Sequence, residues 1–305
     1  MLIFAASDKG GTGRSVTSSN VLYRSALQGT DVCYLDFDFG SPTAGAIFNV
    51  ESVVHGTTRG GLHSYLDGDV AEPQRIDVWD DSDRSSLRNR PPGAGRLVLL
   101  PGDAGGGEFP STREMVIRCG RLFLRLEEEF DLVLVDLSAG RSYATDMVLA
   151  ATALPELASV RARWLVFHRW TRQHVLAASA LVYGTRGILE TGVRHGHDRD
   201  ELADSLRFVR TAVVDPDSPE LEGLRPGQLA WLRECNRDLL ELASTNRVGR
   251  TMLIDSVPLD PVLQWREQLI SDNDVYARRI ANLETVEAFT RLAKLIVDDA
   301  AWETL

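Results

Sequence analysis

The sequence predicts an α/β fold with a mostly parallel, doubly wound sheet flanked by helices. Three observations lead to this expectation. The chain opens with a short apolar run, which breaks into a glycine-rich turn and then into a helical pattern. Apolar runs of strand length then alternate with helical segments along the rest of the chain. Two of these runs end in an aspartate, so carboxylates are expected at the edge where parallel strands end.

Length and composition fit an ordinary soluble globular protein. The chain has 305 residues, of which 44% are hydrophobic and 25% are charged, so it is long enough to bury a large core. We expect one domain over residues 1–305, because no internal repeat and no convincing linker interrupts the pattern. The segment 79–96 is polar and rich in Pro and Gly, and we expect it to form a mobile loop.

The net charge of −11 argues against broad, nonspecific binding to DNA. DNA binding through a local basic patch remains an open alternative. No apolar run reaches the ~18 residues of a conventional membrane span. No signal peptide is visible either, so a cytoplasmic location is expected. The three cysteines are widely spaced and form no CxxC pair, which indicates neither a zinc ribbon nor a disulfide framework.

The pattern from residue 2 onward predicts a βαβ unit. A strand is expected over residues 2–6, a helix over about 15–28 and a second strand over 31–36. The glycines between the first strand and the helix let the backbone approach a phosphate closely, because no Cβ stands in the way. The N-terminus of the helix adds the positive end of its dipole. This part of the chain therefore predicts a phosphate-binding loop.

The later elements continue the alternation of strands and helices. Strands are expected over 97–100, 130–136, 164–168, 206–214 and 251–254, and helices over 61–66, 111–129, 171–191, 225–244 and 283–301. Such alternation implies a parallel sheet that is covered on both faces and joined by right-handed crossovers. The strand over 130–136 ends in Asp136, and an aspartate at such a position can hold Mg²⁺, usually through water.

Four short motifs follow one another along the chain. They are Lys9-Gly-Gly-Thr-Gly-Arg-Ser15, Asp36-Phe-Asp-Phe-Gly40, Asp131-Leu-Val-Leu-Val-Asp136-Leu-Ser-Ala-Gly140 and Ser256-Val-Pro-Leu-Asp260. Their order and spacing resemble the MinD/ParA family of SIMIBI-class P-loop ATPases. The first resembles the deviant Walker A pattern KGGxGK[ST], the second the switch element, the third the Walker B strand and the fourth the late I-P-x-D segment. The resemblance covers most of the chain and implies a P-loop NTPase domain.

The resemblance also implies an ATP or ADP site with Mg²⁺. The residues that would hold the nucleotide are Lys9, Gly10, Gly11, Thr12, Gly13, Arg14, Ser15, Val16 and Pro258. Pro258 would lie near the base, and the others would surround the phosphates. Mg²⁺ would be held by Ser15, Asp36 and Asp136, partly through water. Asp36 and Asp38 could instead cap a turn, and Asp136 could cap a helix or a turn. The set of motifs favours the functional interpretation of all three.

Two residues would carry the chemistry that the resemblance implies. Lys9 matches the family's signature lysine, which reaches the phosphates of the partner across a homodimer with nucleotide at the interface. Asp38 matches the carboxylate that positions or activates the attacking water. Phosphoryl transfer needs charge neutralisation and an oriented water more than covalent help, so this residue set suits slow ATP hydrolysis.

The sequence departs from the family pattern at two places. Arg14 stands where the family has a second lysine, and its planar fork is larger than an ammonium and needs different geometry. The stretch Thr211-Ala-Val-Val-Asp215 lacks the Asn expected to contact the base, so base preference rests on the resemblance alone. The C-terminal helix resembles the membrane-binding helix of MinD in position, but its polar face is acidic. Packing onto the sheet is therefore expected instead of membrane targeting.

Two functions stay open. The first is an ATP-binding, slowly hydrolysing, dimerising switch that positions or recruits a protein partner or cargo. The second is a pseudo-ATPase, a nucleotide-binding or apo scaffold that acts by protein interaction after Arg14 has abolished hydrolysis. Lys9, Asp38 and Asp136 favour the first function, whereas Arg14 favours the second.

Overall fold

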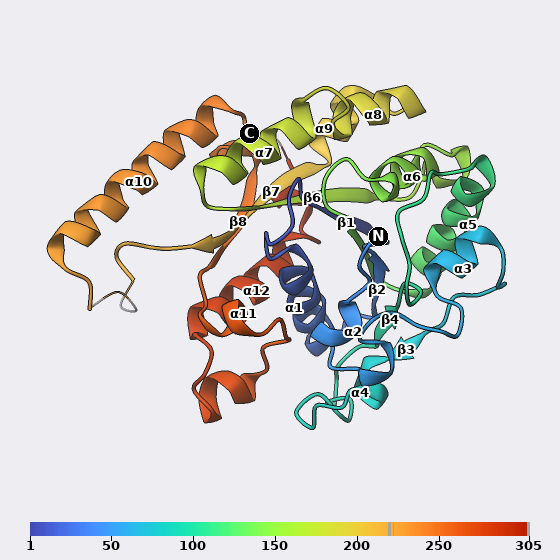
Figure 1. The fold of residues 1–305 in the computed structure, drawn as a ribbon, viewed down its shortest axis with the longest axis horizontal. Helices are drawn as coiled ribbons and strands as arrows, with labels where there is room; N and C mark the ends of the chain where they lie inside the picture. Colours follow the sequence, from blue (N-terminus) through green and yellow to red (C-terminus); the bar gives the residue numbers. More distant parts are fainter. Residues whose placement is uncertain (219–220, 222, 304–305) are drawn as a thin grey trace.

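An eight-stranded sheet runs through the centre of the molecule (Figure 1). The computed structural model describes residues 1–218, 221 and 223–303. The strands are β1 (Leu2–Ala6), β2 (Val32–Phe37), β3 (Ile76–Asp77), β4 (Leu97–Leu100), β5 (Leu132–Leu137), β6 (Ala162–Arg169), β7 (Leu206–Val213) and β8 (Leu253–Pro258). Their order is β3-β4-β2-β5-β1-β6-β7-β8, and every pair is parallel except β3 with β4. The predicted parallel α/β fold is confirmed.

Helices cover both faces of this sheet. The helices are α1 (Arg14–Leu27), α2 (Ala44–Ile47), α3 (Leu62–Asp67), α4 (Val78–Asp81), α5 (Arg113–Glu129), α6 (Tyr143–Thr152), α7 (Arg172–Tyr183), α8 (Ile188–His195), α9 (Arg199–Asp204), α10 (Pro226–Thr245), α11 (Val262–Trp265) and α12 (Leu283–Leu295). Short 3-10 turns cover Glu51–Val53, Pro155–Leu157, Arg250–Met252 and Asp299–Ala301, and a π turn covers Asn273–Ala277. Helices α3 and α5 to α9 cover one face, and α1, α2, α4 and α12 cover the other. Helix α10 extends away from the body (Figure 1).

The residues of β1 show how one strand serves both cores. Leu2, Ile3, Phe4 and Ala5 are all fully buried. Leu2 and Phe4 belong to the core beneath α5, whereas Ile3 and Ala5 belong to the core beneath α1. Successive side chains of a strand point to opposite faces, so a strand that is covered on both faces needs a continuous apolar run. This requirement explains the apolar run Leu2–Ala6.

The carboxyl ends of three central strands meet at one edge of the sheet. In the strand register, Ala5 of β1 lies beside Asp136 of β5, and Asp136 lies beside Asp36 of β2. The glycine-rich loop leaves β1 at the same edge and leads into α1. In parallel α/β sheets, ligands bind in the crevice outside the carboxyl ends of the strands. The topology therefore brings the loop and two of the predicted carboxylates together.

The prediction of a single helix over residues 171–191 is wrong, because the structure has two helices there. Helix α7 ends before Gly184, whose backbone is extended, and α8 begins after Gly187. Between them, Arg186 has a φ of 58°, in the left-handed region. Paired glycines weaken a helix and favour a turn, so they separate two segments that share one helical pattern.

Segment 79–96, expected to be a mobile loop, contacts the body of the protein at several points. Trp79 is 2% exposed, and its indole N–H donates to the Gly95 carbonyl at 3.0 Å. Leu87 is also buried. Arg84 donates to the Leu269 carbonyl at 2.6 Å and pairs with the buried Asp274. The polar composition suggested solvation, but these side chains use their donors on a distant part of the chain.

The C-terminal helix α12 packs inward. Val286, Phe289 and Leu292 are buried, and α12 contacts α1 and β8. The helix ends at Leu295, short of the expected end near residue 301. Within the residues that the structure describes, no helix combines the length and the apolar character needed to cross a membrane.

Candidate functional site

The loop between β1 and α1 is open toward solvent. Gly10, Gly11 and Gly13 are exposed, and Gly11 and Gly13 have φ values of 70° and 75°. Only glycine adopts this left-handed conformation without strain. No atom lies within 4 Å of the position that a Cβ would take at Gly10 or Gly11, so the space above the loop is free. Helix α1 begins at Arg14, and the first amides of a helix have no partners within it, which suits an anion.

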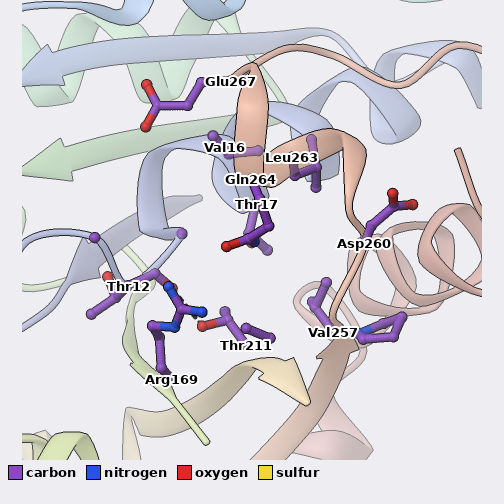
Figure 2. A pocket seen from close by; sticks show the side chains of 14 residues that line it. Thr12, Val16, Thr17, Arg169, Thr211, Val257, Asp260, Leu263, Gln264 and Glu267 are labelled. Carbon is purple, nitrogen blue, oxygen red and sulfur yellow. Dashed lines mark hydrogen bonds between the residues drawn. The ribbon is translucent and has the colours of Figure 1, made fainter. Parts of the chain in front are cut away.

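A cleft with a volume of about 210 Å³ lies beside this loop (Figure 2). It is lined by Gly11, Thr12, Gly13, Val16, Thr17, Arg169, Thr211, Ala212, Val257, Pro258, Asp260, Leu263, Gln264 and Glu267. Strand β8 runs to Pro258, past the expected end at residue 254, and thereby brings Pro258 to the cleft. The cleft joins the loop, where phosphates are expected, to the residue expected near the base. Gly10 and Ser15 do not line it.

Arg14 points away from this cleft and into the carboxylates at the strand ends. Its side chain is 5% exposed. Nε donates to Asp136 Oδ1 at 2.5 Å, and Nη2 donates to Asp38 Oδ2 at 3.2 Å. Nη1 donates to Ser7 Oγ at 3.2 Å, and Nη2 lies 3.4 Å from Ser15 Oγ. Burial lowers the pKa of Arg14, but the charge and hydrogen bond of Asp136 together with the charge of Asp38 more than offset this, so the pKa rises above its ordinary value. The guanidinium therefore stays charged.

Asp136 has a second partner on the neighbouring strand. Its Oδ2 accepts a hydrogen bond from the Tyr34 hydroxyl at 2.8 Å, and Asp136 is only 1% exposed. Burial, followed by the charge of Asp136, raises the pKa of Tyr34 well above its usual value. Tyr34 therefore remains a hydrogen-bond donor, and both oxygens of Asp136 have partners within the protein.

The two carboxylates of the loop after β2 have different environments. Asp36 is buried, and it accepts hydrogen bonds from the amides of Asp38 at 3.3 Å and Ala44 at 3.0 Å. Burial raises the pKa of Asp36 to about 8, although the Ala44 amide opposes the shift. Asp38 is 30% exposed, and burial raises its pKa while Arg14 opposes that change. Asp36 thus fixes its own loop, whereas Asp38 faces the guanidinium.

Lys9 lies on the same loop but outside this cluster. Its side chain is partly exposed, and no hydrogen bond or ion pair joins it to any of the described residues. The structure therefore brings Asp38, Asp136, Arg14 and Ser15 together, and it leaves Lys9 and Asp36 apart from that contact set.

Comparisons with known proteins agree on the fold. No protein-family model matches the chain, and no curated protein matches its sequence. Solved structures match nearly end to end. A chain of the MinC:MinD cell division complex from Aquifex aeolicus has a TM-score of 0.57 at 15% identity and covers 96% of this chain and 94% of that one. MinD with Mg-ADP from Pyrococcus horikoshii OT3 has a TM-score of 0.55 at 16% identity, covering 98% and 96%. This chain has the MinD/ParA-like fold.

A third match carries a different nucleotide. The putative plasmid partition protein from Borrelia burgdorferi B31, bound to AMPPNP, has a TM-score of 0.57 at 13% identity and covers 96% of each chain. Structures of the MinD/ParA-like fold thus include complexes with Mg-ADP and with AMPPNP. At such identities the likeness establishes the fold alone.

Within this MinD/ParA-like fold, the donors expected for Mg²⁺ do not fit the ion. Carboxylate and hydroxyl oxygens are the ligands that Mg²⁺ prefers. However, both oxygens of Asp136 are already bonded, Ser15 Oγ lies against the guanidinium, and Asp36 accepts from two amides. Over residues 1–218, 221 and 223–303, no three His, Cys, Asp or Glu side chains are grouped so that they could hold a metal ion. The positive charge at this point comes from Arg14.

The sequence did not point to several residues of the candidate site. Tyr34 and Ser7 bond to the Asp136–Arg14 pair, and Arg169 and Thr211 line the cleft. Thr211 Oγ1 donates to the Thr12 carbonyl and so attaches β7 to the loop. Tyr34 lies on a strand next to that of Asp136, but a single sequence does not give the strand register that brings them together.

Proposed function

We propose that this chain binds ATP or ADP and works as a nucleotide-dependent, dimerising switch. The observation that carries the proposal is the continuous cleft from Gly11 and Gly13 of the open loop to Pro258. A glycine loop at a helix N-terminus suits phosphates, and a cleft with apolar side chains at its far end suits a base. The nucleotides bound by proteins of the same fold support this assignment.

Lys9 supports the proposal that two copies share the nucleotide. It is a cation on the phosphate loop without an ion pair in the part of the chain that the structure describes. The neighbouring Asp8, in contrast, pairs with Arg141 at 3.0 Å. A lysine that needs no internal partner is free to bind the phosphates of a second copy. The resulting homodimer would have nucleotide at its interface and would present a new surface to a protein partner or cargo.

The contacts of Arg14 favour the second candidate function, a pseudo-ATPase. Asp38, the expected water-positioning carboxylate, pairs with Arg14 at 3.2 Å. Asp136 pairs with the same guanidinium at 2.5 Å. A carboxylate that is held by a buried arginine is a poor base, and small displacements of a catalytic group reduce rates strongly. We therefore expect nucleotide binding with slow hydrolysis or none.

The test is sedimentation velocity of the purified protein with the non-hydrolysable ATP analogue AMPPNP, combined with a phosphate-release assay using ATP. A monomer that becomes a dimer with AMPPNP supports the switch, and dimerisation without phosphate release selects the pseudo-ATPase. Absence of any nucleotide effect on sedimentation, together with absence of phosphate release, would contradict both forms of the switch.

A further inference from the structure

Arg14 lies where two of the three expected metal ligands meet. Its partners Asp136 and Ser15 are two of the residues expected to hold Mg²⁺, and Asp38 is the expected catalytic carboxylate. The guanidinium contacts all three, and Ser7 as well. All three guanidinium nitrogens are used, so the group is held from several sides.

Only an arginine can make this set of contacts. The guanidinium has five N–H donors in a planar fork, and it remains charged in proteins. Here the fork contacts Asp136 through Nε and Asp38 through Nη2, while Nη1 bonds to Ser7. A lysine at position 14 has three donors on one atom, so it cannot offer separate nitrogens to Asp136, Asp38 and Ser7 as the guanidinium does. The residue that departs from the family pattern is therefore the one that the cluster is built around.

The arrangement resists replacement of the guanidinium by a metal ion. Asp136 is 1% exposed, and a buried carboxylate without a cation is strongly unfavourable. An incoming cation would have to displace Arg14 from the Asp136 carboxylate. The Oδ2 atom of this carboxylate also accepts a hydrogen bond from the Tyr34 hydroxyl at 2.8 Å. Two cations at one carboxylate would repel each other, so the guanidinium and a divalent ion exclude each other.

From these contacts we infer that the Arg14 guanidinium replaces the divalent cation of this site, so that the protein binds nucleoside phosphates without Mg²⁺. The part that concerns nucleotides rests on the proposed function, whereas the part that concerns the metal does not. Arg14 supplies one positive charge where Mg²⁺ would supply two. Lys9 and the amides of the loop are then the remaining groups that balance the phosphates.

The first experiment uses the metal alone, without nucleotide. Mn²⁺, a paramagnetic substitute for Mg²⁺, is titrated into the full chain and its free concentration is followed by electron paramagnetic resonance. We expect the wild type to show no site-specific Mn²⁺ binding, and Arg14→Met to bind one Mn²⁺ per chain. Mg²⁺ should displace this ion. Adding Asp136→Asn to Arg14→Met should abolish its binding. Arg14→Gln, which is also uncharged but keeps a polar group for Ser7 and Asp38, serves if the Met variant does not fold.

The matched control is Arg24→Lys, because Arg24 is a buried arginine on the same helix that pairs with Asp272 at 2.5 Å, away from the site. This variant should bind no more Mn²⁺ than the wild type. Mn²⁺ binding by the wild type that Asp136→Asn abolishes would overturn the inference. Failure of folded Arg14 variants to gain Mn²⁺ would overturn it as well.

The second experiment measures ADP binding by calorimetry with Mg²⁺ and with EDTA. For the wild type we expect dissociation constants that agree within about threefold, and for Arg14→Met at least about tenfold tighter binding with Mg²⁺ than with EDTA. Wild-type binding that weakens about tenfold or more in EDTA would contradict the inference, because Arg14 would then leave the carboxylates to a metal. Absence of ADP binding in both buffers would contradict the proposed nucleotide function instead, and the Mn²⁺ titration would then decide the role of Arg14.

Discussion

Arg14 is a buried cation whose two carboxylate partners differ in exposure. The side chain of Asp136 is 2% exposed, whereas that of Asp38 is 30% exposed. Removing one partner of a buried ion pair leaves an uncompensated charge, whereas an exposed pair contributes little. The cluster therefore depends on the Arg14–Asp136 contact for stability, and its contact with Asp38 matters mainly for what the site can bind.

We predict that Arg14→Met lowers the free energy of unfolding by about 3–5 kcal/mol, because it leaves Asp136 charged and buried. Asp38→Asn should lower it by less than about 1 kcal/mol. Urea denaturation of both variants measures the difference. Adding Asp136→Asn to Arg14→Met should recover part of the loss, and equal losses for the two single variants would contradict the assigned burial.

The buried His168 side chain should lower the free energy of unfolding in acid. Its side chain is 1% exposed, and burial lowers its pKa to about 4. The unfolded chain, with a histidine pKa of about 6.5, binds more protons than the folded one between these values, so stability falls as pH drops through that window. From pH 7 to pH 5 this residue should cost about 2 kcal/mol of unfolding free energy.

The measurement is urea denaturation at both pH values with the wild type and His168→Phe. The variant places an aromatic ring where the His168 ring contacts Trp170 and Phe208, but this ring cannot be protonated. It should lose less stability than the wild type on acidification. An identical loss in both proteins would show that His168 does not titrate as described.

The loop between β1 and α1 is the element on which the site is built. Gly11 and Gly13 have positive φ, whereas Gly10 does not. We expect Gly13→Ala to lower the free energy of unfolding by about 1–2 kcal/mol through backbone strain. Gly10→Ala, which meets no atom within 4 Å and needs no unusual φ, is the matched control and should change stability little. Thermal unfolding compares the two, and equal effects would contradict the loop conformation.

Elements with strong local patterns could be predicted from the sequence, whereas contacts between distant residues could not. The continuous apolar run of β1 and the glycines after it predict a strand followed by a glycine-rich turn, and the structure has both. The direction of the Arg14 side chain depends on Asp136, 122 positions away. Segment 79–96 is attached through Arg84 to Asp274, 190 positions away. No local pattern encodes such contacts.

At the scale of the whole molecule, the sheet places the loop at an edge where a second copy has access to it. We predict that Lys9→Ala binds nucleotide but no longer dimerises with AMPPNP, because the cation that would cross to the partner is missing. The matched control is Lys294→Ala, since Lys294 is the only other lysine and is exposed on α12. Sedimentation velocity of both variants with AMPPNP tests this prediction. Dimerisation of Lys9→Ala would contradict it.

The most direct test of the nucleotide site is a calorimetric titration of the wild type with AMPPNP. The cleft beside Gly11, Thr12 and Gly13 predicts saturable binding of one nucleotide per chain. Gly13→Ala should weaken that binding, because the altered φ moves the loop amides away from the phosphates. Absence of binding by the folded wild-type protein at millimolar AMPPNP would contradict the assignment of this cleft as a nucleotide site.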